Sequence, residues 1–126
     1  MNLLLDTNAL VSVLATPEKL SAAAREAIRS TENGVFVSAA SAWALDILRR
    51  EGRPDTPDDL ELQMITKGFD PLPVKMSHAQ AVHLLPDLHG DPFDRILVAQ
   101  AQVEGLTLVT SDQTMWRYPV ATMPAI

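Results

Sequence analysis

The chain has 126 residues, 47% of them hydrophobic, and a formal net charge of −6. This length suits a single domain, residues 1–126, that builds its own core. The absence of cysteine excludes disulfides, thiolate catalysis and zinc–sulfur sites. The negative charge argues against a protein that merely coats duplex nucleic acid. It is compatible with a nuclease, whose site must itself be acidic, and with a protein that captures a basic peptide.

Membrane and secretion signals are also missing from the pattern. No run reaches ~18 apolar residues, and the N-terminus has no basic segment followed by a sustained apolar one. We therefore expect no membrane span and no secretory leader. A reducing, cytoplasmic environment fits the lack of cysteine.

The first half of the chain alternates apolar runs with helical patterns. Three consecutive leucines near the N-terminus predict a strand buried on both faces, as in a parallel sheet. Ser, Thr or Asp lies at the start of each helical pattern, and Pro or Gly follows within a few residues of its end. The expected elements are a strand at 2–6, helices at 7–15 and 21–30, a turn at 33–34, a strand at 35–37, and a helix that Ser38 or Ser41 caps and that ends near Gly52.

The second half continues the alternation. Two prolines in the segment 69–74 indicate a sheet edge or a loop. Pro92 suits the first turn of a helix, and Gly105 suits a helix end. The expected elements are a helix from Thr56 or Asp58 to Gly68, a helix at 77–85, a loop at 86–90, a helix at 92–104, a strand at 106–109, a helical turn at 112–117 and a short strand within 118–124.

Strands that alternate with helices indicate an α/β sandwich with a parallel sheet. In such sheets, ligands bind beyond the carboxyl ends of the strands. Asp6 closes the first predicted strand, and Asp112 follows the last long one. Asp91 and Asp94 lie at the start of the helix predicted between them. Carboxylates gathered at one edge repel one another, so we expect a hard divalent cation such as Mg²⁺ there.

Each aspartate also has a purely structural interpretation. Asp6 and Asp91 are favoured helix N-caps, and Asp94 suits the positive end of a helix dipole. Asp112 is a candidate for a turn in which its side chain binds the backbone. None of these explains why all four surround one expected crevice.

Histidines and aromatic residues give weaker signals. His78, His83 and His89 lack the i, i+4 spacing of a zinc-binding helix, and no serine nucleophile accompanies them. We expect them at the surface or at helix ends, with His89 the one that could reach the acidic residues. The aromatic residues Trp43, Phe93 and Trp116 are interpreted as core or interface residues rather than as platforms for base stacking.

Four segments together resemble the PIN domain family and, within it, the VapC-type toxins of bacterial toxin–antitoxin pairs. They are LLLDTNAL at 3–10, VSAASAW at 37–43, HGDPFDR at 89–95 and TSD at 110–112. Their order covers the whole chain, and the combination is specific although each segment alone is weak. The resemblance implies a three-layer α/β/α sandwich with a central, mainly parallel sheet.

The resemblance also implies an activity and partners. The expected activity is endonucleolytic cleavage of RNA with Mg²⁺ or Mn²⁺ by a homodimer or a toxin–antitoxin hetero-oligomer, and the expected partner is a VapB-type antitoxin that blocks the site. By position, Asp6 and Asp94 match the main metal ligands, Asp112 the residue that closes the site, and Asp91 a more variable acidic position. Asn8 and Thr110 or Ser111 match residues that orient carboxylates or a water, and Arg95 is the best-placed candidate for an RNA contact.

One position departs from the family pattern. The family usually has a metal-binding glutamate where this chain has Ala44. Asp46 lies about 200° further around the helix, and Glu51 lies about 10 Å further along the same face. Neither is a convincing replacement. Two explanations stay open: a Glu-to-Ala change made so that a toxic nuclease could be handled, or a natural homologue with an incomplete site.

Three functional hypotheses follow. The first is metal-assisted phosphodiester hydrolysis, weakened or lost through Ala44. The second is a non-catalytic module that binds antitoxin or RNA, which Ala44 favours and the four aspartates oppose. The third is a phosphotransferase with Asp6 as nucleophile, which the sequence disfavours because Asn8 stands where such sites have a second aspartate.

Overall fold

A computed structural model describes residues 1–52 and 57–126. Within these residues, no helix combines the length and apolar character that crossing a bilayer requires. The strands are β1 (Asn2–Leu5), β2 (Gly34–Ser38), β3 (Asp70–Leu72), β4 (Thr107–Val109) and β5 (Thr122–Met123). The helices are α1 (Thr7–Ala15), α2 (Ala22–Arg29), α3 (Ala39–Arg50), α4 (Leu60–Lys67), α5 (Met76–His83) and α6 (Pro92–Glu104), with short 3₁₀ turns η1 (Pro17–Lys19) and η2 (Met115–Arg117).

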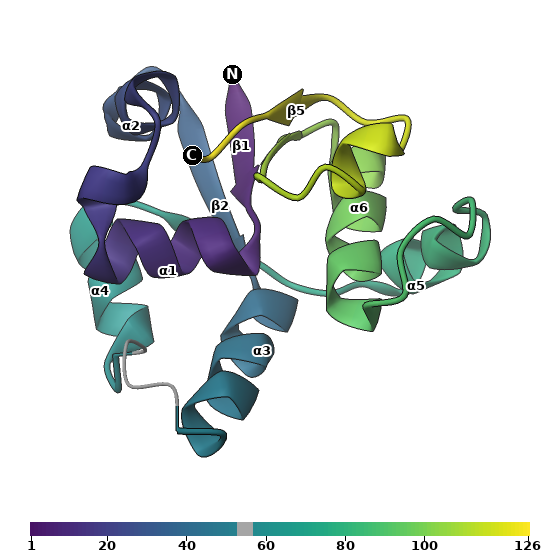
Figure 1. Ribbon diagram of the computed structural model, residues 1–126, viewed down its shortest axis with the longest axis horizontal. Coiled ribbons are helices and arrows are strands. Elements are labelled where there is room, and N and C mark those ends of the chain that lie inside the picture. The colour runs from purple at the N-terminus through teal and green to yellow at the C-terminus, as the bar shows by residue number, and fades with distance from the viewer. Residues whose placement is uncertain (53–56) are drawn as a thin grey trace.

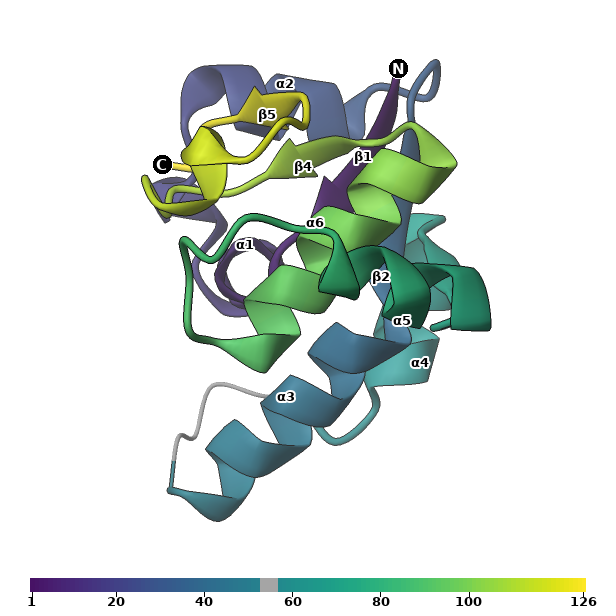
Figure 2. The ribbon, with the colours of Figure 1, turned by 90° about the vertical axis from the view of Figure 1, so that its right-hand side faces the viewer.

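The five strands form one sheet in the order β3-β2-β1-β4-β5, and all neighbouring strands are parallel. Helices α1, α2 and α4 lie on one side of β1 and β2, and α5 and α6 lie on the other (Figure 1). After a 90° turn, α5 and α6 face the viewer, and α3 extends below the sheet (Figure 2). The three-layer sandwich and the parallel sheet predicted from the sequence are therefore confirmed.

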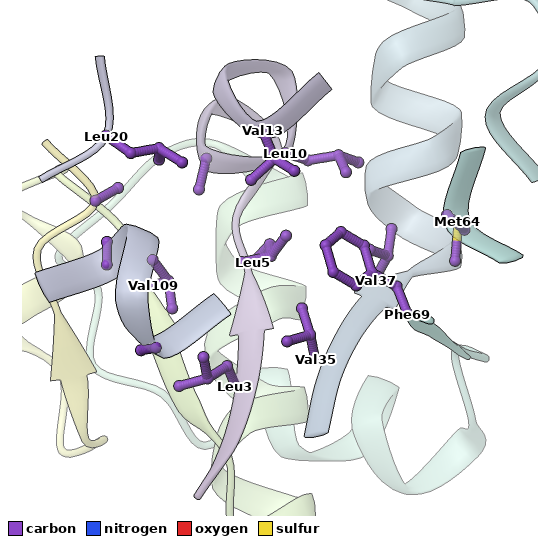
Figure 3. Close-up of a cluster of buried hydrophobic side chains, with 14 of the residues drawn as sticks. Leu3, Leu5, Leu10, Val13, Leu20, Val35, Val37, Met64, Phe69 and Val109 are labelled. Carbon is purple, nitrogen blue, oxygen red and sulfur yellow. The ribbon is translucent and has the colours of Figure 1, made fainter. Parts of the chain in front are cut away.

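The three leucines of β1 explain how both layers attach to the sheet. Leu3, Leu4 and Leu5 are each completely buried. Leu3 and Leu5 belong to a cluster with residues of α1, α2, α3 and α4 (Figure 3), whereas Leu4 belongs to a second cluster with residues of α5 and α6. Because successive side chains of a strand point to opposite faces, one run of leucines anchors the helices of both layers.

Several element boundaries differ from those predicted. Leu5 ends β1, because Asp6 already serves as the N-cap of α1. Ser38 caps α3 through a bond from the Ala40 N–H (3.0 Å), whereas Ser41 lies inside the helix and is buried. The predicted helical turn at 112–117 is shorter, because the Asp112 side chain accepts the Thr114 N–H and forms a turn first.

The start of α4 was also predicted incorrectly. Asp58 is not its cap: the helix begins at Leu60, and Asp58 instead lies 3.6 Å from the Arg49 guanidinium. The alternative start at Thr56 lies outside the described residues. The predicted stop at Gly68 is confirmed, since Gly68 adopts a φ of 73°, a left-handed conformation that favours glycine.

Candidate metal centre

The strand order places the acidic residues together. β1 lies between β2 and β4, so the chain reverses its direction of winding across the sheet at β1, and crevices form at such points beyond the strand ends. The Asp6 N–H donates to the Val109 carbonyl at 3.1 Å and ties the end of β1 to the end of β4. Asp6 and Asp112, which follow these two strands, line one cavity of about 270 Å³.

Asp6 is the most buried of the four carboxylates, with 3% of its surface exposed. Its Oδ1 accepts the Ala9 N–H at 2.7 Å, so it caps α1 as its structural interpretation required. Burial raises the pKa of Asp6, hydrogen bonds from Thr110 and Ala9 oppose the rise, and repulsion by Asp112 adds to it. A capping role and a place in the acidic centre therefore coexist in this residue.

The N-terminus of α6 contributes two carboxylates. Asp91 is the N-cap, and its Oδ1 accepts the N–H groups of Phe93 (2.8 Å) and Asp94 (3.3 Å). Burial raises the pKa of Asp94 to about 6; repulsion by Asp91 and, more weakly, by Asp6 and Asp112 adds to the rise, and His89 opposes it. Asp94 thus experiences the other three carboxylates as neighbouring negative charges.

The side chain of Asp112 is more exposed than those of Asp6 and Asp94. Burial would raise its pKa, but hydrogen bonds from His89 and the backbone of Thr114 outweigh burial and lower it. The Oδ2 of Asp112 lies 2.8 Å from His89 Nε2, and its Oδ1 lies 2.9 Å from the Thr114 nitrogen. Asp112 is therefore held in its charged form.

A divalent cation fits this arrangement. The residues offer carboxylate oxygens, which are the ligands that Mg²⁺ and Mn²⁺ prefer. A cation would lower the raised pKa values of buried Asp6 and partly buried Asp94, because an opposite charge favours the ionised form of a carboxyl group. Among the described residues, one group of possible ligand atoms, from His89, Asp94 and Asp112, lies within 4.8 Å of one another.

Position 44 faces the same centre. Ala44 lines a cavity of about 290 Å³ together with Asn8, Asp91 and Asp94. Asp46 forms an ion pair with Arg50 (3.0 Å) outside this cavity, as the helical spacing predicted. Glu51 lines the cavity, but its carboxylate is not part of the group of possible ligands. The cavity leaves room for a longer side chain at position 44 beside Asp94.

The residues expected to support the carboxylates differ in their contacts. Thr110 is fully buried, bonds to Asp6 and accepts the Asp112 N–H at 3.0 Å, so it links two carboxylates. Ser111 instead accepts the N–H of Ile126 at 2.8 Å. Asn8 is exposed and lines both cavities, so it lies between the Asp6 and Asp94 sides of the centre.

Arg95 was predicted to contact RNA; in the structure its guanidinium makes hydrogen bonds within the protein. Its Nη2 donates to the Val82 carbonyl (3.2 Å), and its Nη1 donates to the Pro86 carbonyl (3.1 Å) and the Tyr118 hydroxyl (3.3 Å). The guanidinium therefore fastens the loop that precedes α6. Adjacency to Asp94 in the sequence did not predict this, because the side chain follows the helix back toward α5.

The structure narrows two further predictions. His78 lies in the first turn of α5, one of the helix ends expected for the histidines, but it is completely buried, and its Nε2 lies 2.8 Å from Glu104 Oε2. Trp43 was predicted to be a core or interface residue, and its 65% exposure excludes the core; its ring meets Phe93 edge-on with centroids 5.3 Å apart. His89 was expected to reach the acidic residues only as an alternative, and the structure places it against two of them.

Comparisons with known proteins agree with this fold. The family model described as PIN domain matches residues 3–120. Three similar solved structures are VapBC2 from Rickettsia felis bound to a promoter DNA fragment (TM-score 0.78, 16% identity, 100% of both chains), FitAcB from Neisseria gonorrhoeae (0.68, 20%, 97% of this chain and 96% of the other) and a toxin–antitoxin complex from Klebsiella pneumoniae (0.60, 16%, 96% and 95%). No curated protein matches the sequence significantly.

Proposed function

The chain belongs to the PIN domain family, and from this premise we propose that it is a metal-dependent endoribonuclease toxin of a toxin–antitoxin pair, weakened or inactivated because Ala44 replaces a carboxylate. The observation that carries the proposal is the gathering of four carboxylates at one sheet edge: Asp6 and Asp112 line one cavity, Asp91 and Asp94 line the other, and ligand atoms of Asp94 and Asp112 lie within 4.8 Å of each other. Their separate capping and turn roles do not require them to lie in one place, and a cation removes the cost of gathering them.

In this proposal each residue has a defined task. Asp6 and Asp94 bind the metal, and Asp112 binds it directly or through a water. When bound, Mg²⁺ or Mn²⁺ supplies an activated water and stabilises negative charge on the scissile phosphate. Asp6 is held in place by the Ala9 N–H and Thr110, and the α6 N-terminus, with its positive dipole end, adds attraction for anions.

The alanine at position 44 limits the proposed activity. Loss of residues that only orient metal ligands costs roughly 10–100-fold, so loss of a ligand itself should cost at least as much. The cavity beside Ala44 supports this interpretation, because a glutamate side chain there would extend toward Asp94. We expect little or no cleavage by the chain with Ala44.

We also propose a VapB-type antitoxin as partner, with assembly as a homodimer or a toxin–antitoxin hetero-oligomer. Two of the structural neighbours, VapBC2 and the Klebsiella pneumoniae complex, support an antitoxin. Trp43 and the residues around it support a protein contact, because they line an apolar groove of about 600 Å³.

The second candidate function is a PIN-fold module that binds antitoxin or RNA without cutting it. Ala44 favours this candidate, because it removes one carboxylate from the centre. The four aspartates oppose it, because their mutual repulsion contributes to the raised pKa of Asp94 and a bound cation would relieve that repulsion.

Cleavage of total RNA with Mg²⁺ or Mn²⁺ tests the two candidates. Three proteins are compared: this chain, Ala44→Glu, and Ala44→Glu with Asp6→Asn, in which the amide still caps α1. Cleavage that appears with Ala44→Glu and disappears in the double variant supports the nuclease. A chain with Ala44 that cleaves as fast as Ala44→Glu contradicts the role of position 44. No cleavage by any folded variant favours the binding module.

A further inference from the structure

His89 contacts two carboxylates of the proposed metal centre through one nitrogen. Its Nε2 lies 2.8 Å from Asp112 Oδ2 and 3.2 Å from Asp94 Oδ2. By distance alone, the imidazole looks like a third ligand that could take the place of the missing glutamate. The hydrogen bond on the other ring nitrogen contradicts that interpretation.

The Nδ1 of His89 accepts the Asp91 N–H at 3.0 Å. A backbone N–H always carries its hydrogen, so Nδ1 must present a lone pair, and the ring hydrogen of a neutral imidazole then sits on Nε2. An Nε2–H group donates hydrogen bonds and has no lone pair for a metal. Coordination through Nε2 would require the hydrogen to move to Nδ1, where it would face the Asp91 N–H.

The surroundings hold His89 in this orientation. Its own backbone N–H donates to the Tyr118 hydroxyl at 2.9 Å, and Tyr118 is buried. Arg95 donates to the same hydroxyl and to the loop that carries His89. Asp91, which fixes Nδ1, is itself the N-cap of α6. The imidazole is therefore fixed relative to the helix that presents Asp94.

We propose that His89 is a positioning residue: its Nε2–H holds the Asp112 carboxylate against the Asp94 side of the centre, and the imidazole is not a metal ligand. This inference rests on the proposed function, in which Asp112 binds a metal ion directly or through a water. The bond to His89 connects Asp112, on the loop after β4, with the start of α6. Without it, the Asp112 side chain would keep its hydrogen bonds from the backbone of Thr114 and Met115, which belong to its own turn.

His78 provides a matched control. Its Nδ1 accepts the Lys75 N–H at 2.9 Å and its Nε2 lies 2.8 Å from Glu104 Oε2, which repeats the geometry of His89. Glu104 does not belong to the group of possible ligands. A substitution at His78 therefore removes the same kind of bond at a place where no metal effect is expected.

The first test is the tautomer of His89, read from the ¹⁵N resonances of its ring by long-range ¹H–¹⁵N NMR. We expect the hydrogen on Nε2 without metal and at saturating Mg²⁺, with His78 giving the same pattern under both conditions. A hydrogen on Nδ1, without metal or after Mg²⁺ is added, overturns the inference.

The second test is Mn²⁺ affinity by EPR for His89→Leu, His89→Gln and the control His78→Leu, each in the chain with Ala44 and in Ala44→Glu. The glutamine amide keeps an N–H donor near the position of Nε2, whereas leucine has none. We expect His89→Leu to bind Mn²⁺ about 10-fold more weakly, in the range for residues that orient ligands, and His89→Gln to recover most of that loss. The His78→Leu control should bind as the parent does.

The outcomes separate the two proposals. Equal losses in His89→Leu and His89→Gln, or no loss in either, overturn the positioning role while Mn²⁺ binding by the parent stands. If neither parent binds Mn²⁺, the proposed function fails, and the role of His89 toward a metal fails with it. Circular dichroism confirms that each variant is folded.

Discussion

Within residues 1–52 and 57–126, the same histidine–carboxylate arrangement occurs twice, and the two copies differ in their surroundings. His78 and His89 both accept a backbone N–H on Nδ1 and meet a carboxylate through Nε2 at 2.8 Å. His78 is completely buried and joins α5 to Glu104 at the end of α6, with Lys75 3.9 Å from the same carboxylate. His89 is partly exposed and joins the start of α6 to Asp112, with Asp94 3.2 Å away.

The same histidine–carboxylate bond can therefore have different roles, depending on the charges around the carboxylate. The Lys75 ammonium group lies beside Glu104 and offsets its negative charge, so the bond between His78 and Glu104 serves to join α5 to α6. Asp112 lies beside further carboxylates, so the bond between His89 and Asp112 leaves a net negative charge on this group that a metal ion would balance. The comparison predicts that His78 matters to stability and His89 to metal binding.

The largest effect is expected on stability from His78→Ala. The change leaves a cavity and removes the partner of the Lys75 N–H inside the protein, and we expect it to lower the free energy of unfolding by about 2–4 kcal/mol. His89→Ala, at a partly exposed site, should cost about 1 kcal/mol. Urea denaturation of both variants measures the difference, and equal losses would remove the distinction between the two pairs.

The next effect is a gain of stability from Asp94→Asn. The folded-state pKa of Asp94, about 6, lies above its ordinary value of 3.8, so ionisation destabilises the fold as the pH rises between these values. At pH 7 without metal, the neutral amide should raise the free energy of unfolding by about 1–3 kcal/mol, and the gain should vanish near pH 4. A variant that is less stable than the parent at pH 7 would contradict the electrostatic strain at the centre.

Metal affinity should depend on pH through the same carboxylate. Since Asp94 must be ionised to bind a cation, Mn²⁺ affinity should be nearly constant above pH 7 and fall as the pH drops through about 6. One proton competing with the metal gives about a 10-fold loss between pH 7 and pH 5. A titration of Mn²⁺ by EPR at several pH values measures this, and an affinity that is flat down to pH 5 would exclude Asp94 as a ligand.

The smallest effect is expected from Glu104→Gln. The hydrogen bond to His78 lowers the pKa of Glu104, so its charged form adds stability that is present above pH 4.5 and is lost as the pH falls through the lowered value. The amide should therefore destabilise the fold slightly at neutral pH, with no change in Mn²⁺ affinity.

Asp112→Asn, at the corresponding carboxylate of the His89 pair, should instead weaken Mn²⁺ binding about 10-fold or more. Equal Mn²⁺ affinities of the two variants would break the comparison.

Much of the fold was predictable because local signals and the sheet pattern agree. The leucines of β1, Pro92 at the start of α6, and Gly68 and Gly105 in left-handed conformations after α4 and α6 all lie where sequence rules place them. The start of α4 was not predictable in this way, because the adjacent residues Asp58 and Asp59 are equally good caps by residue type. Asp59 is the N-cap in the structure, and Asp58 lies near Arg49 instead.

The site was predictable in part. The alternation of strands and helices predicted that Asp6 and Asp112 follow parallel strands. The structure adds that these two strands, β1 and β4, are neighbours in the sheet. The roles of Arg95 and His78 could not be predicted, because a side chain's partners come from elements distant in sequence: Arg95 bonds to Val82 and Tyr118, and His78 bonds to Glu104.

The sequence by itself determined the alternation of strands and helices, the family resemblance, and the alanine at position 44 where the family pattern has a glutamate. These are properties of residue order and type: hydrophobic periodicity records the elements, and the four motifs carry the resemblance. Only the tertiary structure decided that Asp94 experiences three other carboxylates, that Ala44 faces a cavity beside it, and that His89 donates to Asp112. Burial, electrostatic repulsion and hydrogen-bond direction depend on distances between distant segments, and those distances exist only once the sheet has assembled.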